Sequence, residues 1–378
     1  MNFHMPVKLY FGPGEINKIR SIVKNEFNTA HPMLVTDKGI VESGLTKKIS
    51  SNLDKIEIFD KVEANPRSTT INTAGDLACE KKIDMIIAMG GGSALDAGKA
   101  IAVLATNKGV IEDYEGKEKY LNDPLPVLAI PTTCGTGSEV TWVAVITDTK
   151  RSFKMSVKGS KMYPAVSIVD PDLLLTLPKS IIASTGMDAL THAIEAYTVK
   201  PATLITNHFA IKAIKLIINS IESASHDIKN SIARESLMYG STMAGFAFGN
   251  SDVGSVHCIS ESIGALFDIP HGVANAIFLP WVMKFNMPEC VEKFSNIAFE
   301  IGIKEKDNKK AAEKLIKNII SLSQRLKIPT FSDLNISEDK YHLIAEYSFQ
   351  NNSTPSNARD INVADYLEIL NAAAVGKQ

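Results

Sequence analysis

The chain contains 378 residues, of which 45% are hydrophobic and 22% are charged, and its formal net charge is −2 at pH 7. This length predicts two domains, and the apolar content is sufficient for a large hydrophobic core. The near-neutral charge argues against nucleic acid or an anionic membrane surface as a partner, and no apolar run approaches the roughly 18 uncharged residues of a membrane span.

Cysteine usage and the opening segment predict a cytoplasmic setting. The four cysteines are widely spaced and form no CxxC pair, so a disulfide framework is not expected. The opening MNFHMPVKLYFGPGEINKI lacks a basic stretch followed by an apolar core and is therefore not expected to be a secretory signal.

The first half alternates short apolar runs with helical patterns. Strands are expected at residues 33–36 (MLVT), 55–62 (KIEIFDKV), 85–89 (MIIAM) and 127–130 (VLAI). Helices are expected over residues 71–84 and from about Ser93. Apolar strands that alternate with helices are typical of βαβ units, in which a parallel sheet is covered on both faces.

The second half is predicted to be helical. Strand patterns almost vanish after residue 180, and residues 205–225 and 307–328 have helical periodicity. We therefore expect an α/β dinucleotide-binding domain over residues 1–178 and an all-helical metal-binding and catalytic domain over residues 179–378. The polar, turn-rich residues 349–360 (FQNNSTPSNARD) are expected to form an exposed loop before a final helix.

A glycine turn joins the third strand to a helix. Gly90, Gly91 and Gly92 allow close approach of a ligand to the backbone, and free N–H groups at a helix N-terminus suit a phosphate. Ser93 could cap the helix or donate to the phosphate. The alternative is a tight turn without a ligand, and the run is not a GxGxxG fingerprint.

A second loop of this kind, PTTCGTGSE at residues 131–139, follows the fourth strand. Its hydroxyl groups and glycines, at the carboxyl end of a parallel strand, fit the place where open α/β sheets bind ligands. Asp37 ends the strand MLVT, the second strand of the candidate nucleotide domain, where an acidic residue can accept hydrogen bonds from the adenosine ribose. VTDKG is equally a good turn sequence.

Metal-ligating residue types gather in two apolar helical segments. Asp188 and His192 are four residues apart in GMDALTHAIEAY and share a helix face, and His257 and His271 lie in the segment GSVHCISESIGALFDIPHGVANAIF. A buried carboxylate and imidazole can form a simple structural hydrogen bond. Three histidines and one aspartate are also a suitable ligand set for Fe²⁺ or Zn²⁺.

The runs GGGSALDAGK, PTTCGTGSEVT, GMDALTHAIEAY and VHCISESIGALFDIPHGVANAIFLP occur in one order, between an opening KLYFGPG and a late RLKIPTF. With this order and spacing the chain resembles the iron-containing (group III) alcohol dehydrogenase family over essentially its full length. The resemblance implies a Rossmann-like α/β domain followed by a helical domain, the architecture shared with dehydroquinate synthase. It also implies NAD(H), Fe²⁺ with Zn²⁺ as the alternative ion, and a homodimer or larger homo-oligomer.

The resemblance assigns roles to individual residues. The implied metal ligands are Asp188, His192, His257 and His271. The implied cofactor-binding residues are Gly91, Gly92, Ser93, Asp96, Thr132, Thr133, Thr136, Ser138, Asn65, Lys154 and Asp37, the last favouring NAD over NADP. Phe248 matches an aromatic residue that borders the substrate pocket.

Two departures from the family pattern concern the substrate. Many relatives carry a second histidine four residues after the position of His257, and here that residue is Glu261. Its carboxylate could relay a proton, anchor a cationic or hydroxylated substrate, or orient a water, or it could simply hydrogen-bond nearby backbone. Trp142 and Val143 stand where relatives often have smaller or polar residues, so they are candidate pocket residues.

The sequence therefore predicts a metal-dependent oxidoreductase that transfers a hydride between NAD(H) and a small primary alcohol or aldehyde. Alternatives are a zinc glycerol or diol dehydrogenase, a non-redox dehydroquinate synthase-like enzyme and a structural metal- or nucleotide-binding protein. Absence of Lys and Arg from residues 181–197 and 251–280 disfavours the phosphate-eliminating enzyme, and the additional ligand His192 favours the four-ligand iron type.

Overall fold

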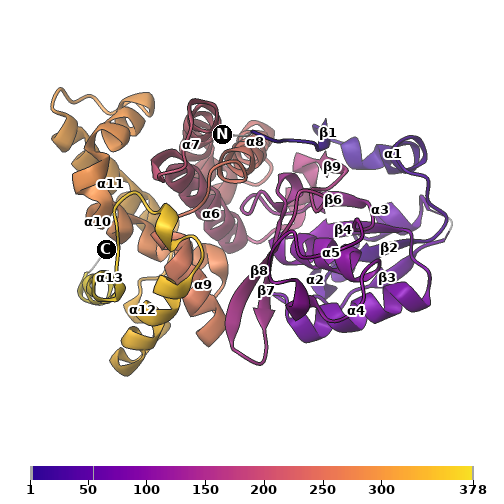
Figure 1. Cartoon of the computed structure of the whole chain (residues 1–378). Coiled ribbons are helices and arrows are strands. Elements are labelled where there is room, and N and C mark those ends of the chain that lie inside the picture. Colours follow the sequence, from indigo (N-terminus) through magenta and orange to yellow (C-terminus); the bar gives the residue numbers. More distant parts are fainter. Residues whose placement is uncertain (1–2, 54, 377–378) are drawn as a thin grey trace. The chain divides into compact units, whose positions relative to one another are not determined.

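The computed structural model describes residues 3–53 and 55–376, and the chain divides into two compact units. An α/β unit contains residues 4–133 and 137–177. A helical unit contains Phe3, residues 134–136 and the described residues from 178 onward. Figure 1 shows the α/β unit in indigo to magenta and the helices of the second unit in the later colours.

The α/β unit is built on a six-stranded sheet with the order β1-β9-β6-β4-β2-β3, and every neighbouring pair in it is parallel. The strands are β1 (Lys8–Phe11), β2 (Pro32–Val35), β3 (Glu57–Phe59), β4 (Met85–Gly90), β6 (Val127–Pro131) and β9 (Val166–Val169). The α/β class is thereby confirmed, although β3 is shorter than the strand expected over residues 55–62.

Helices cover both faces of this sheet (Figure 1). Along β4, Ile86 and Ala88 join a buried cluster with α4 (Ser68–Glu80) and α5 (Gly92–Leu104). Met85, Ile87 and Met89 point to the opposite face and join a cluster with α1 (Ile19–Glu26), α2 (Lys38–Glu42) and α3 (Lys47–Ser50). A strand buried on both faces must be apolar at every position, which is why MIIAM lacks polar alternation.

A second, three-stranded sheet has the order β5-β8-β7, from β5 (Gly116–Lys117), β7 (Val143–Asp148) and β8 (Phe153–Lys158). The antiparallel β7–β8 hairpin was not among the expected elements. Its strands alternate buried and partly buried side chains, as in Ala144 and Ile146 against Val143 and Val145, so the period-two pattern of VAVITD was the missed indication.

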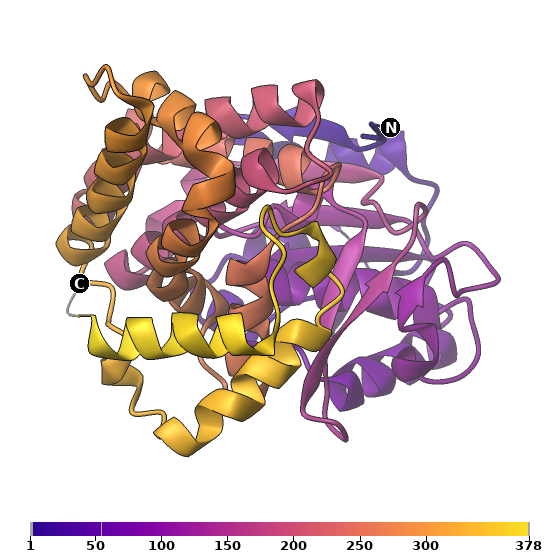
Figure 2. The ribbon, with the colours of Figure 1, turned by 60° about the vertical axis from the view of Figure 1, so that its left-hand side comes forward.

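The helical unit contains eight α-helices among its described residues. They are α6 (Lys179–Thr198), α7 (Leu204–His226), α8 (Ser231–Phe248), α9 (Ser255–Phe267), α10 (His271–Glu300), α11 (Asn308–Arg325), α12 (Tyr341–Gln350) and α13 (Val363–Val375). Short 3₁₀ turns occupy Ser332–Leu334, Glu338–Lys340 and Thr354–Ser356 here, and Glu15–Lys18, Ile111–Tyr114, Ser138–Val140 and Pro171–Thr176 in the α/β unit. Figure 2 shows α12 and α13 in yellow, with the segment that joins them.

The expectation of an exposed loop over residues 349–360 was right about the connection to the final helix and wrong about much of its exposure. Within it Asn351, Ser353, Thr354 and Asn357 are buried. Their side chains hydrogen-bond to other parts of the helical unit, and polar residues can be buried when each finds such partners. We call residues 351–360 the polar strap.

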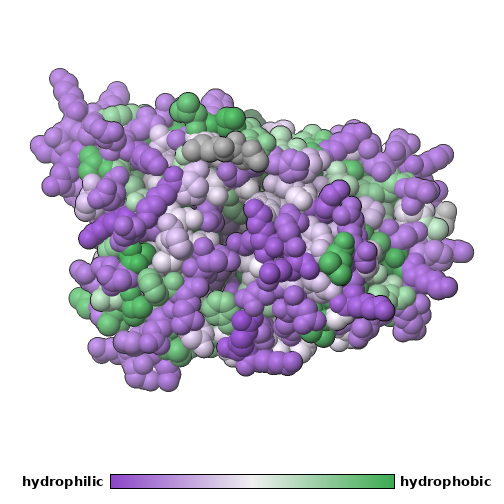
Figure 3. Space-filling view, viewed as in Figure 1, coloured by the Kyte–Doolittle hydropathy of each residue, from purple (hydrophilic) through white to green (hydrophobic). Residues whose placement is uncertain are grey.

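Two observations concern the surface and the apolar character of the helices. On the face shown in Figure 3, hydrophilic residues predominate and hydrophobic residues form small, separate patches. Across the described part of the chain, none of the helices combines the length and the apolar character that crossing a bilayer requires.

Candidate active site

The first two candidate ligands project from one face of α6. Asp188 and His192 are 2% and 5% exposed, so neither is an ordinary solvated side chain. The Nδ1 atom of His192 lies 3.0 Å from the main-chain oxygen of Asp188, which can only accept a hydrogen bond. The proton of His192 is therefore on Nδ1, and the lone pair is on Nε2.

His257, near the start of α9, brings a second imidazole to this face. Its Nε2 atom lies 2.9 Å from Nε2 of His192, and its Nδ1 atom lies 2.5 Å from a carboxylate oxygen of Glu195. If both rings carry their protons on Nδ1, two lone pairs meet at 2.9 Å. Such an arrangement is repulsive unless a proton or a cation lies between the two nitrogens.

His271 is the first residue of α10, and its Nε2 atom lies 3.8 Å from Oδ1 of Asp188. The next residue must be glycine, because a Cβ atom on Gly272 would lie only 2.6 Å from the main-chain oxygen of Ser184 and 3.3 Å from Cβ of Asp188. This close approach of α10 to α6 places the His271 ring beside the aspartate.

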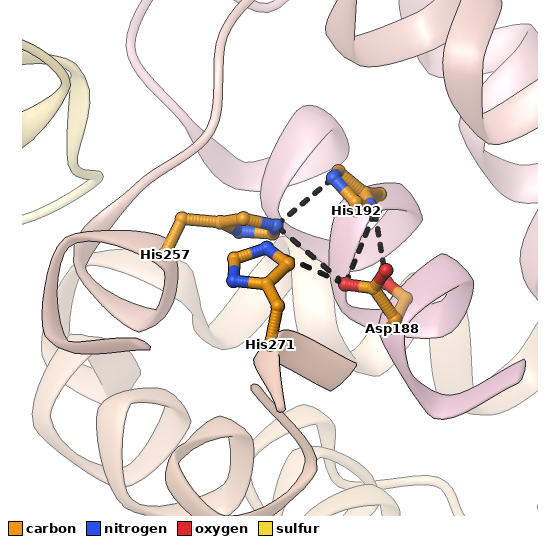
Figure 4. Close-up of side chains that lie close together, drawn as sticks. All are labelled: Asp188, His192, His257 and His271. Atoms are coloured by element: carbon orange, nitrogen blue, oxygen red, sulfur yellow. Dashed lines mark hydrogen bonds and ion pairs between the residues drawn. The ribbon is translucent and has the colours of Figure 1, made fainter. Parts of the chain in front are cut away.

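The four side chains form one cluster, in which one donor atom from each lies within 4.8 Å of the others (Figure 4). Three imidazole nitrogens and one carboxylate oxygen are ligands that Fe²⁺ and Zn²⁺ accept. The opposed Nε2 atoms of His192 and His257 are compatible with such an ion, because a bound cation, like a proton on His257, would remove their repulsion. The residues present therefore fit a divalent transition metal.

The pKa values of His192 and His257 shift in opposite directions. Burial, reinforced by nearby His257, lowers the pKa of His192 well below its usual range, so His192 is neutral near pH 7. Burial acts against charge on His257 too, but the carboxylates of Glu195, Asp188 and Glu261 raise its pKa above the usual value. A neutral imidazole is the form that binds a metal, and His192 is held in that form.

Two buried residues of this centre were missed from the sequence. Glu195 lies on α6 and contacts His257, as described above. Asn275, on α10, donates its Nδ2 to Oδ1 of Asp188 at 2.6 Å and lies 3.1 Å from Nε2 of both His257 and His271. Their positions seven residues after Asp188 and four after His271 put them on the ligand faces, which was the available signal.

Phe248 and Glu261, two of the candidate substrate-pocket residues, also belong to the helical unit. The ring of Phe248 stacks on that of His192, with centroids 4.3 Å apart and planes inclined by 25°. Glu261 is partly buried one turn after His257, and Asn351 of the polar strap donates to its Oε2 at 2.6 Å. Phe248 thus contacts a metal ligand directly, whereas Glu261 is held by the strap.

The cofactor candidates gather at the carboxyl ends of three neighbouring strands, β2, β4 and β6. α5 begins at Gly92 with Gly91 as its N-cap, so the expectation that Ser93 caps the helix was wrong. Thr133, after β6, lies beside this turn, because a Cβ atom on Gly91 would be 3.3 Å from its methyl group. The main-chain N–H of Thr132 donates to the oxygen of Gly90 at 2.9 Å.

Asp37 follows β2 and caps α2, where it accepts a hydrogen bond from the N–H of Ile40 at 3.0 Å. Its second carboxylate oxygen would lie 3.3 Å from a Cβ atom on Gly90, so the aspartate also borders the glycine turn. Asp37 is therefore a helix cap and not a residue of a simple turn, and this position is compatible with the ribose interpretation.

Asp96 and Ser138 are bound to each other in the α/β unit. Ser138 Oγ donates to Asp96 Oδ1 at 2.5 Å, and Asp96 also accepts from the N–H of Val145 at 2.9 Å. Lys99, which is 1% exposed, lies 3.1 Å from Asp96 and donates to the carbonyl oxygens of Ser138 and Val143. This buried lysine, missed from the sequence, fixes the second loop to α5; burial lowers its pKa.

The remaining candidates divide between the two units. Lys154 Nζ donates to Oδ1 of Asn65 at 2.6 Å, and Asn65 adopts a left-handed backbone conformation with φ 59°. Trp142 lies under the ammonium group of Lys117, 5.1 Å from its ring centroid, and Val143 begins β7. Thr136 belongs to the helical unit. The preceding residue, Gly135, approaches Asp188 closely, because a Cβ atom on Gly135 would lie 3.0 Å from Oδ2 of Asp188.

Comparison with known proteins identifies this combination of fold and site. Residues 6–171 match the family described as iron-containing alcohol dehydrogenase, and residues 182–374 match the C-terminal part of the Fe-containing alcohol dehydrogenase family. The chain therefore belongs to the iron-containing alcohol dehydrogenase family. It is an oxidoreductase that interconverts alcohols and aldehydes with a nicotinamide cofactor, as the sequence predicted.

Individual relatives match over nearly their whole length. The chain is 35% identical to the NAD-dependent methanol dehydrogenase of Bacillus methanolicus, covering 98% of this chain and 99% of the relative. It is 37% identical to the 1,3-propanediol dehydrogenase of Citrobacter freundii, covering 98% of each. A crystal structure of a 1,3-propanediol oxidoreductase superposes with a TM-score of 0.95 at 37% identity, covering 98% of this chain and 99% of the other.

Proposed function

We propose that the chain is an iron-dependent, NAD-preferring enzyme acting on small primary alcohols and the corresponding aldehydes. The observation that carries this proposal is the buried convergence of Asp188, His192, His257 and His271. Similarity to proteins named for methanol and 1,3-propanediol supports a short alcohol or diol as substrate. The family's description supports Fe²⁺, with Zn²⁺ as the alternative, and His192 within the cluster favours the four-ligand type over a zinc glycerol dehydrogenase.

When bound, the metal ion supplies Lewis-acid polarisation of the substrate oxygen. The protein's own residues hold the ligand set, exclude water and position the reactants. Neutral His192 is kept in the ligating form, and Phe248 covers its ring with an apolar surface. Asn351 of the polar strap donates to Oε2 of Glu261 and so holds this carboxylate one helical turn from His257.

For the cofactor, we assign the diphosphate to the turn at Gly91 and Gly92 with Ser93, because α5 presents free N–H groups there. The loop residues Thr132, Thr133, Thr136 and Ser138, with Asp96, and the pair Asn65 and Lys154 remain proposed cofactor residues. Trp142 and Val143 remain proposed pocket residues. The free cysteines support a reducing, cytoplasmic setting, and the family resemblance supports a homo-oligomer.

The test is NADH oxidation by anaerobically purified protein, reconstituted with Fe²⁺ or with Zn²⁺, against a panel of short aliphatic aldehydes and hydroxyaldehydes. We expect turnover that requires metal and is faster with Fe²⁺. Equal turnover by the metal-free protein would contradict the metal assignment, and faster turnover with Zn²⁺ would replace iron with zinc. Inactivity toward every aldehyde, despite metal and NAD binding, would contradict the substrate class.

Asp37 is expected to determine the preference for NAD. Asp37→Ser removes the charge but keeps a side chain that can cap α2. Loss of a charged hydrogen bond to the ribose should lower kcat/KM for NADH by roughly 10- to 100-fold, and loss of repulsion should raise kcat/KM for NADPH. Both constants would be measured beside Glu42→Gln, which removes an exposed charge from the same helix. An unchanged NADH to NADPH ratio in Asp37→Ser would contradict the assignment.

A further inference from the structure

Glu195 is a buried carboxylate that none of the roles above uses. It lies on α6 three residues after His192 and is 4% exposed. Its Oε2 atom accepts from the N–H of Gly254 at 2.9 Å and lies 2.5 Å from Nδ1 of His257, and its Oε1 atom accepts from the N–H of Val256 at 2.8 Å. The carboxylate is thus surrounded by three donors.

These contacts determine which nitrogen of His257 carries the proton. A carboxylate accepts hydrogen bonds, so the Nδ1 proton of His257 is directed to Glu195, and in the neutral ring the lone pair is then on Nε2. We propose that Glu195 is a positioning residue of the metal centre, which fixes the tautomer and the direction of His257 by accepting its Nδ1–H. This inference rests on the proposed metal-dependent function, because Nε2 of His257 is the atom that would bind the ion.

The same carboxylate joins two ligand-bearing helices. α9 begins after Gly254, which has no side chain to cap the helix. Glu195 of α6 accepts the N–H of Val256, which such a cap could satisfy, and the N–H of Gly254 itself. A Cβ atom on Gly254 would lie 3.0 Å from Oε1 of Glu195 and 3.1 Å from Oδ1 of Asn357 in the polar strap. A side chain at this position would push these oxygens back by a few tenths of an ångström, so glycine favours the close approach of the carboxylate to the start of α9.

The three donors are satisfied only if both terminal atoms of the side chain, at the positions of Oε1 and Oε2, accept hydrogen bonds. In Glu195→Gln, an amide nitrogen in place of Oε2 would face the N–H of Gly254 and would turn His257 into the tautomer with its proton on Nε2. An amide nitrogen in place of Oε1 would face the N–H of Val256 instead. Either arrangement places donor against donor, and the first also blocks the ligating nitrogen.

The experiment measures affinity of the full-length, metal-free protein for Zn²⁺ and for Fe²⁺ by competition with a chelator. Glu195→Gln is expected to weaken binding by roughly 10- to 100-fold, the usual effect of losing an outer partner of a histidine ligand. Glu195→Asp, which keeps the acceptor but withdraws it from His257, is expected to give an intermediate loss. If Glu195→Gln does not fold, Glu195→Asp alone decides, and undiminished affinity in it would overturn the proposal.

Two controls separate positioning from general destabilisation. Asp252→Asn alters a carboxylate that bonds Ser353 and Ser356 of the polar strap without touching a ligand, and it should leave metal affinity unchanged. In a His257→Ala background, Glu195→Gln should change affinity by less than about 2-fold, because its effect passes through the missing ring. An equal effect in both backgrounds would overturn the proposal.

The experiment also distinguishes this inference from the proposed function. If the wild-type protein binds neither ion, the metal-dependent function itself fails. If wild type and Glu195→Gln bind metal equally tightly, only the role of Glu195 fails.

Discussion

His271→Ala is expected to lower kcat by on the order of 10³-fold with every accepted substrate while leaving the helical unit folded. The reason is that His271 supplies one of the four donor groups but contributes little to packing, because its side chain is the most exposed of the four, at 24%. The removed imidazole leaves a gap that water can fill. Anaerobic kinetics and metal content per chain would be measured together.

The matched control is His342→Ala, which removes an exposed imidazole on α12 in the same unit. Thermal unfolding of the metal-free variants should be similar to that of wild type. Full activity of His271→Ala at wild-type metal content would show that His271 is not a ligand. Unfolding of the variant would instead show a structural role for this ring.

Lys99→Met is expected to destabilise the protein by about 3–5 kcal/mol, the typical effect of removing one partner from a buried ion pair. The substitution keeps the apolar stem but leaves Asp96 without its cation and the carbonyl oxygens of Ser138 and Val143 without a donor. Urea unfolding would measure the free-energy change, with Lys48→Met on the exposed side of α3 as the control.

The double variant Lys99→Met/Asp96→Asn tests the cause of that loss. Since it removes both charges, it should be less destabilised than the sum of the two single variants. Additive losses would show that the charges of Lys99 and Asp96 are not coupled. Because Lys99 holds the second loop, KM for NADH should also rise in Lys99→Met.

Features with a local pattern could be predicted from the sequence. Asp188 and His192 share a helix face because they are four residues apart, and each glycine loop follows a fully apolar strand. The parallel sheet follows from those apolar strands and the helices between them. The residue types grouped His257 and His271 with the α6 pair as a candidate ligand set, and the family resemblance then assigned all four as ligands. The structure brings all four together.

Features that depend on a distant partner could not be predicted. Glu195 resembles any acidic residue of a helix until Gly254 and Val256 of α9 are placed against it. The polar strap has the composition of an exposed loop, and only its contacts with residues of α9 and α10 show why Thr354 and Asn357 are buried. Lys99 likewise has the usual appearance of a surface lysine, because its carbonyl partners lie about 40 residues further along the chain.

The polar strap has a consequence for synthesis on the ribosome. The N–H of Ser255, at the start of α9, donates to Oδ1 of Asn357, a residue 102 positions later. The hydroxyl group of Thr354 likewise donates to the sulfur of Cys258 in α9. When all four metal ligands have left the ribosome, the groups that complete the start of α9 are still to be made. A nascent chain can thus present its histidines to metal ions before the pocket around them is closed, and the final arrangement of the centre must wait for a late, long-range contact.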